Sequence, residues 1–146
     1  MSYTRGVPAS PQPTEAELNV LKVLWERGPS TVREVHEQLY SQRDVGYTTT
    51  LKLLQNLFGK GLVKRKERQR QHVYSAAVSE QRTLNSLVRR WADQTFGGSS
   101  AALAMRALDT GRVSREELDS LKAQIARLEL REKELREKEL REKERR

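Results

Sequence analysis

The side chains best suited to chemistry are polar and cationic groups in two neighbouring segments. On a predicted helix over residues 47–60, hydroxyl, ammonium and carboxamide groups lie away from the leucines: Tyr47, Thr48, Thr49, Lys52, Gln55 and Asn56. Five bases then fall within seven residues: Lys64, Arg65, Lys66, Arg68 and Arg70. Such groups can contact base edges in a DNA major groove and bind its phosphates. A solvated amphipathic helix beside a basic surface would show the same pattern.

Signatures of catalysis and of metal binding are missing. The chain has no cysteine, which excludes disulfides, thiolate zinc sites and cysteine nucleophiles. The two histidines, His36 and His72, are far apart in the sequence, and no Gly-rich phosphate loop, HExxH or Gly-x-Ser-x-Gly motif occurs. We therefore expect a protein that is not an enzyme, with no metal site and no cofactor.

The net charge of +8 is concentrated in one part of the chain. Residues 52–90 contain ten bases and two acids, whereas the two signs nearly balance elsewhere. A basic block next to a neutral remainder favours a polyanionic partner. No run of about 18 apolar residues occurs, and residues 1–13 lack the apolar stretch of a signal peptide. These features predict a cytoplasmic protein without membrane insertion.

Three short helices are expected to come first in the folded region. Thr14 and Thr31 each precede a glutamate by three residues, the spacing of a capping box that opens a helix. Gly28-Pro29 ends the first helix and residues 44–46 end the second. The third runs from about Tyr47 to Lys60, with its apolar residues at Leu51, Leu54, Leu57 and Phe58, and Gly61 follows as its stop.

A small β-hairpin is predicted after the third helix. Residues 62–66 and 71–75 are its strands, and the four residues Glu67–Arg70 form the loop. The loop has no Gly or Asn, so we do not expect a two-residue type I′ turn. Three helices followed by a basic hairpin is the order of a winged helix-turn-helix domain, here over residues 14–78. The fold class is thus mostly α with a small β-hairpin.

Residues 79–128 are predicted to be a helical dimerisation region. A helix from Ser79 to about Phe96, a short helix over Ala101–Leu108 and a third helix opened by Ser114 have too little apolar surface for a monomeric core. The last of these helices has a 3-4-3 apolar spacing typical of a coiled-coil seam. The residues expected to dimerise are Leu84, Leu87, Val88, Trp91, Leu118, Leu121, Ile125 and Leu128.

The two ends of the chain are expected to lie outside these domains. Residues 1–13 include three prolines among small polar residues, which predicts a disordered arm. Residues 129–146 form a charged tail with three copies of Leu-Arg-Glu-Lys-Glu. A five-residue repeat scatters Leu130, Leu135 and Leu140 around a helix, so they cannot form a seam. Glutamates four residues before a base favour a solvated helix.

The chain resembles the penicillinase-repressor (BlaI/MecI) family. The resemblance is carried by Thr14–Trp25, Gly28–Val35 and Gly46–Leu57, and continues through Gly61-Leu-Val, His72-Val-Tyr74 and Phe96–Ser99. It implies a homodimeric winged-helix repressor that binds inverted-repeat DNA operators, with Thr48, Thr49 and Lys52 on its recognition helix and the basic hairpin as support. It also implies release of repression by a membrane sensor-protease system that cuts in the dimerisation region.

Two features depart from that family pattern. The Asn-Phe bond cut in protease-regulated members is replaced by Ala104-Met-Arg-Ala-Leu108, and the cysteine-rich tail of a copper-responsive branch is missing. Our leading hypothesis is a sequence-specific, homodimeric transcriptional repressor. Two alternatives remain open: a winged-helix adaptor that binds protein partners through its charged tail, and a protein that coats DNA without sequence preference.

Overall fold

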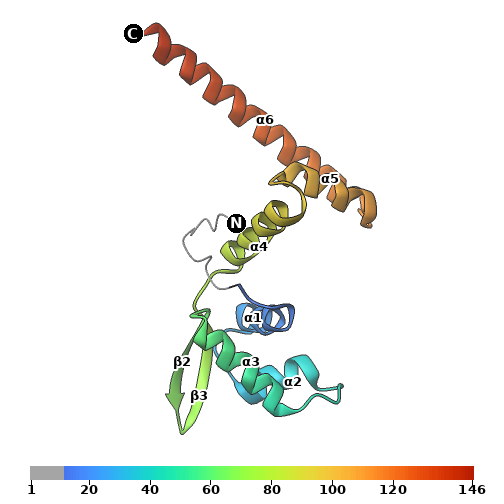
Figure 1. The fold of residues 1–146 in the computed structure, drawn as a ribbon, viewed down its shortest axis with the longest axis vertical. Helices are drawn as coiled ribbons and strands as arrows, with labels where there is room; N and C mark the ends of the chain where they lie inside the picture. The colour runs from blue at the N-terminus through green and yellow to red at the C-terminus, as the bar shows by residue number, and fades with distance from the viewer. Residues whose placement is uncertain (1–11) are drawn as a thin grey trace, which may run out of the picture. The chain divides into compact units, whose positions relative to one another are not determined.

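A computed structural model describes residues 12–146, which form two compact units divided after Gly98 (Figure 1). The predicted arm over residues 1–13 lies almost wholly outside the described residues. The first unit contains α1 (Glu15–Arg27), β1 (Ser30–Thr31), α2 (Val32–Tyr40), α3 (Tyr47–Gly59), β2 (Val63–Arg68), β3 (Gln71–Ala76) and α4 (Glu80–Thr95). The second contains α5 (Ser100–Thr110) and α6 (Arg115–Glu144). The mostly helical fold class with a small sheet is confirmed.

The starts of α1 and α2 are fixed by the predicted capping boxes. The hydroxyl of Thr14 accepts a hydrogen bond from the backbone N–H of Glu17, and that glutamate's carboxylate accepts one from the N–H of Thr14. Thr31 and Glu34 repeat the arrangement at α2. Each box satisfies two backbone donors that a helix end leaves free. Local sequence therefore sets where both helices begin.

The core of the first unit lies between α1, α2, α3 and the sheet. Its fully buried apolar side chains include Leu21 of α1, Val35 of α2, Leu54 and Leu57 of α3, and Tyr74 of β3. The helical spacing of these positions gives each helix one apolar face. The indole N–H of Trp25 donates to the carbonyl of Val78 over 2.9 Å, which fixes the end of the sheet to α1.

The sheet has three antiparallel strands in the order β1-β3-β2. We predicted only the two strands of the hairpin, which we call the wing (residues 63–76). The additional strand β1 pairs Ser30 with Tyr74 and Thr31 with Val73. With only two residues it is too short to show a period in the sequence. It joins the start of α2 to the central strand of the sheet.

The turn of the wing corrects our prediction. The strands pair as far as Arg68 and Gln71, so the loop has two residues instead of the four expected. Gln69 and Arg70 have φ values of 51° and 65°, the left-handed conformation that a type I′ turn requires at both positions. Pairing of the flanking strands outweighs the unfavourable backbone conformation of two residues that carry a Cβ.

A partly buried ion pair joins the two ends of the three-helix core. Glu17 is 1% exposed, and Lys60, at the end of α3, donates to its Oε1 over 2.5 Å. Burial by itself raises the pKa of Glu17. Hydrogen bonds from Lys60 and Thr14, together with the positive charge of Lys60, outweigh burial and hold this pKa below its ordinary value. Lys60 also donates to the carbonyl of Gln12 over 3.0 Å.

The second unit differs from the first because it has no buried residue in either helix. α6 is continuous for 30 residues, so the predicted seam and charged tail are parts of one helix.

None of the helices in residues 12–146 has the length and apolar composition needed to cross a membrane. α4 belongs to the first compact unit. We predict a functional boundary after residue 78, because we expect α4 to take part in dimerisation, and this boundary stays a prediction.

Candidate nucleic-acid interface

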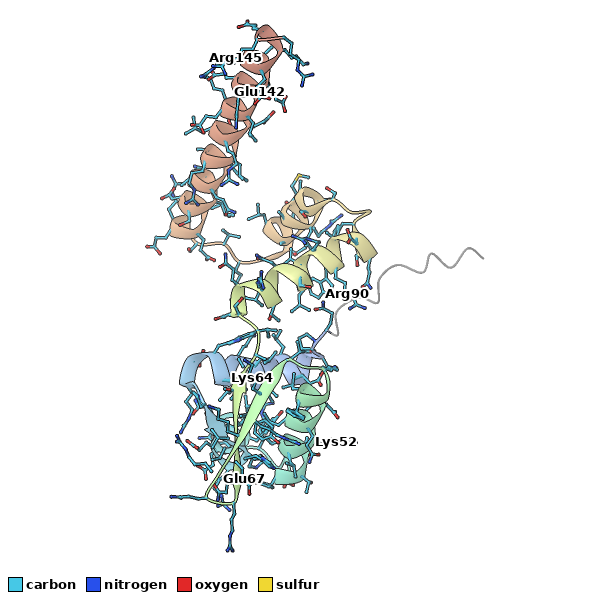
Figure 2. The ribbon with its side chains drawn as sticks, turned by 90° about the vertical axis from the view of Figure 1, so that its left-hand side faces the viewer. Lys52, Lys64, Glu67, Arg90, Glu142 and Arg145 are labelled. Atoms are coloured by element: carbon cyan, nitrogen blue, oxygen red, sulfur yellow. The ribbon has the colours of Figure 1, made fainter. Side chains whose placement is uncertain are left out.

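The outward face of α3 carries the polar side chains singled out in the sequence. Thr48, Thr49, Lys52, Gln55 and Asn56 are all exposed, and Tyr47 is 46% exposed. Figure 2 shows Lys52 on the surface of this helix. The opposite face is buried through Thr50, Leu54 and Leu57. α3 therefore presents hydroxyl, ammonium and carboxamide groups to solvent while its other side is anchored in the core.

His36, which sequence reasoning left without a role, links α2 to α3. His36 Nδ1 and the hydroxyl of the buried Thr50 share a hydrogen bond of 2.7 Å. The imidazole also meets the ring of Tyr47 edge-on, with centroids 5.9 Å apart. The sequence signal was available, because Thr50 is a polar residue on the apolar side of a predicted helix and needs a partner when buried.

The bases of the wing divide between its two faces. Alternation along β2 places Lys64, Lys66 and Arg68 on one face, and Val63, Arg65 and Glu67 on the other. Figure 2 labels Lys64 and Glu67 at opposite ends of this strand. Five bases close together in the sequence are therefore not one patch: three share a face, Arg65 is on the other, and Arg70 lies in the turn.

Phe58 and Arg65 connect the wing to α3. We predicted Phe58 among the apolar residues of the third helix, but it is 39% exposed and is the only one of that set not packed in the core. The guanidinium of Arg65 lies over its ring, 3.9 Å from the centroid. Stacking of a cation on an aromatic face is favourable and restrains the guanidinium. Arg65 thus holds the wing beside α3.

A hollow between α2, α3 and the wing brings together side chains from three segments that are separated in the sequence. Its lining includes Arg33 of α2, Tyr47 of α3, Arg70 of the turn and His72 of β3. We predicted Tyr47 and Arg70 as site residues but missed Arg33 and His72. For Arg33 a signal existed: a cation in the first turn of a helix opposes the helix dipole, so its presence there suggests another role.

The residues predicted to dimerise are largely uncovered within one chain. Leu84, Val88 and Trp91 of α4 and Leu118, Ile125 and Leu128 of α6 are exposed, Trp91 to 64%. Leu87 and Leu121 are half-buried. Isolated exposed leucines are common, but apolar residues repeated along one helix face indicate a surface that another protein covers.

Three helices, a short sheet and a basic wing beside the exposed face of α3 define a winged helix-turn-helix protein. The sequence profile of the penicillinase repressor family matches residues 13–127. The chain belongs to this family, as its motifs had predicted.

Two relatives and one solved structure illustrate the similarity. The transcriptional regulator BlaI of Mycobacterium tuberculosis is 35% identical over 117 residues, 79% of this chain and 83% of the relative. The penicillinase repressor of Bacillus licheniformis is 24% identical over 111 residues, 76% of this chain and 87% of the relative. The solution structure of the DNA-binding domain of the repressor BlaI is 30% identical, covers 49% of this chain and 87% of that one, and superposes with a TM-score of 0.45.

Proposed function

We propose that this protein is a transcriptional repressor that binds a specific DNA operator through α3 and the wing. The observation that carries the proposal is the exposed face of α3, where Thr48, Thr49 and Lys52 lie opposite a buried face in a unit with a basic wing. An α-helix of this kind fits a DNA major groove, and cations beside it bind phosphates. Membership of a repressor family supports the same function.

The repressor acts as a homodimer in this proposal. The exposed apolar residues of α4 and α6 are the dimerisation surface, and residues 14–78 are the DNA-binding domain. Because a two-fold symmetric dimer presents two copies of α3, its operator is an inverted repeat with half-sites about one helical turn apart. Pairing also raises affinity, since the second half-site is bound at a high effective concentration, for a gain of about 10²–10⁴-fold.

The test compares two pairs of substitutions on operator and random duplexes. Lys52→Ala and Thr49→Ala should weaken operator binding selectively, by about 1–3 kcal/mol if a base contact is lost. Lys66→Ala and Arg68→Ala on the wing should weaken binding to both duplexes and lower the salt slope by about one unit each. Wild-type protein that binds both duplexes equally at every salt concentration would contradict the proposal and favour non-specific DNA coating.

Release of the operator is proteolytic in this proposal. α5 has no buried residue and lies between glycines, of which Gly97 and Gly98 adopt positive φ. A short exposed helix of this kind opens locally, which a protease requires. Purified protein should keep its operator when a β-lactam or a metal ion is added, and should lose it after a protease cuts within residues 100–110. Direct loss of binding on adding a small molecule would contradict this mechanism.

A further inference from the structure

The hollow between α2, α3 and the wing has the chemistry of an anion site. Its volume is about 250 Å³, and two guanidinium groups, a phenol and an imidazole contribute to its lining. These come from three separate parts of the chain: Arg33 from α2, Tyr47 from α3, and Arg70 and His72 from the wing. Among the described residues, no aspartate or glutamate lines it. A concave surface with clustered cations and no carboxylate attracts an anion from outside the chain.

Arg33 supports this interpretation independently, through its place in α2. As the second residue of the helix it lies beside the positive end of the helix dipole, where a cation is unfavourable. Within residues 12–146 it forms no ion pair that would offset this effect. The neighbouring Glu34 is bound to Arg27 and to the backbone of Thr31. The guanidinium of Arg33 is therefore available to an anion from outside the chain.

The ring of Tyr47 and the backbone that carries Arg70 are ordered before any ligand binds. Tyr47 packs edge-on against His36, which is hydrogen-bonded to the buried Thr50. Arg70 lies in a tight two-residue turn whose strands are paired up to their last residues. Groups that are already ordered lose little conformational entropy when they bind, which favours binding.

We propose that this hollow binds one phosphate of the DNA backbone, with Arg33 and Arg70 as its main contacts. The inference rests on the function proposed above. Arginine forms charge-assisted, bidentate hydrogen bonds with phosphate oxygens, and the phenol of Tyr47 can donate another. Because the hollow includes the first residue of α3, a phosphate bound there would fix the register of this helix in the groove. Such a contact orients the protein and carries no sequence information itself.

The test neutralises one operator phosphate at a time by methylphosphonate substitution and measures affinity by fluorescence anisotropy. For the wild type, one lesion in each half-site should weaken binding about tenfold, as expected for loss of a hydrogen bond to a charged group. For the double variant Arg33→Gln/Arg70→Gln the same lesion should have an effect below about twofold, because both main contacts are already lost, and Arg33→Gln alone should give an intermediate effect. Lys22→Gln, an exposed cation on α1, is the matched control and should retain the wild-type response.

Other outcomes would overturn the proposal. If Arg33→Gln and the lesions act additively at every position, the hollow binds no phosphate of the operator. If inorganic phosphate binds the operator complex as tightly as it binds the free protein, and Arg33→Gln abolishes that binding, the hollow is a site for free phosphate that the operator does not occupy. In either case, wild-type preference for operator over random duplex in the same measurements would leave the proposed repressor function intact.

Discussion

Single side chains in this protein connect elements that are distant in sequence. Glu17 and Lys60 join the start of α1 to the end of α3, and His36 joins α2 to Thr50 of α3. All four residues are polar groups in positions that helical periodicity assigns to the core or its border. A buried polar group is stable only with a partner, so such pairs fix one arrangement of the helices.

The Glu17–Lys60 pair predicts how stability depends on pH. The pKa of Glu17 is lower in the folded state than in the unfolded state, where it is about 4.3. The ionised carboxylate therefore stabilises the fold above that pH, and this stabilisation is lost as the pH falls through the lower folded-state pKa. Glu17→Gln should lower the free energy of unfolding at pH 7 by about 1.5–3 kcal/mol and flatten its decline in acid.

Urea unfolding between pH 7 and pH 3 measures both effects. Glu26→Gln serves as the control, because Glu26 is an exposed residue of the same helix. This variant should keep the stability and the pH profile of the wild type. An unchanged acid profile in Glu17→Gln would show that the ion pair does not contribute to the stability of the fold.

Among the elements, the helices were predictable from sequence and the tip of the wing was not. Capping signals and apolar periodicity act within one or two turns, so α1, α2 and α3 begin at or next to the expected residues. The turn at Gln69 and Arg70 depends on strand pairing across the hairpin, which no local signal reveals. The same holds for β1 and His72, whose neighbours lie far away in the sequence.

Substitution at Gln69 tests the conformation of the turn. Asparagine adopts the left-handed conformation more readily than other residues with a Cβ, and valine adopts it poorly. Gln69→Asn should therefore stabilise the protein and Gln69→Val should destabilise it, each by up to about 1 kcal/mol in urea unfolding. At Gln71, which lies in β3, the order should reverse because β-branched residues favour strands. Equal effects of valine at both positions would contradict the two-residue turn.

For the whole molecule, substitutions at two exposed apolar residues of α6 test whether this helix forms the dimer interface. Ile125 is 54% exposed on α6, within the predicted seam, and Leu140 is 56% exposed on the same helix but does not fall on the heptad positions of the seam. Ile125→Glu should give a monomer in sedimentation, with operator affinity reduced because the paired half-site is lost. Leu140→Glu should remain a dimer. If both variants stay dimeric, α6 does not form the dimer interface.

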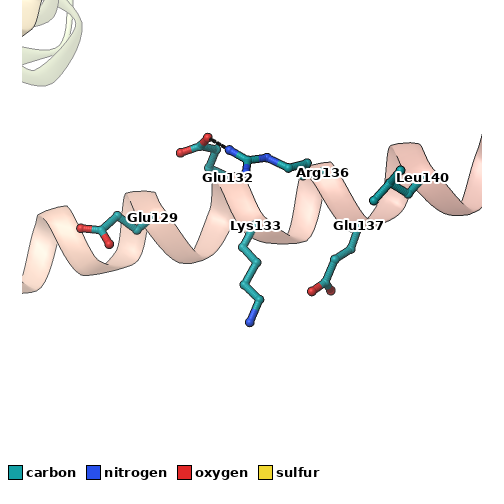
Figure 3. A pocket seen from close by; sticks show the side chains of 6 residues that line it. All are labelled: Glu129, Glu132, Lys133, Arg136, Glu137 and Leu140. Atoms are coloured by element: carbon teal, nitrogen blue, oxygen red, sulfur yellow. Dashed lines mark hydrogen bonds and ion pairs between the residues drawn. The ribbon is translucent and has the colours of Figure 1, made fainter.

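The charged tail is held together by local interactions. Arg136 is paired with Glu132, as the dashed line in Figure 3 marks, while Lys133 and Glu137 point to the other side of the helix. Glu137 pairs with Arg141 four residues later. Such pairs stabilise an isolated helix by about 0.2–0.5 kcal/mol each. Continued into the tail, the heptad of the seam has Glu132, Leu135, Glu139 and Glu142 at its core positions, so two parallel copies would repel each other at the three glutamates.

The last prediction follows from this charge pattern and from the family match, which ends at residue 127. A chain that stops after Leu128 keeps every residue of the proposed seam, of α3 and of the wing. Its operator affinity and its dimeric state should therefore stay within about twofold of the wild type, because local ion pairs in the tail are not coupled to distant sites. Anisotropy and sedimentation measure the two properties. Loss of operator binding on truncation would show that the tail contributes to DNA recognition, and capture of a protein partner that needs the tail would favour an adaptor.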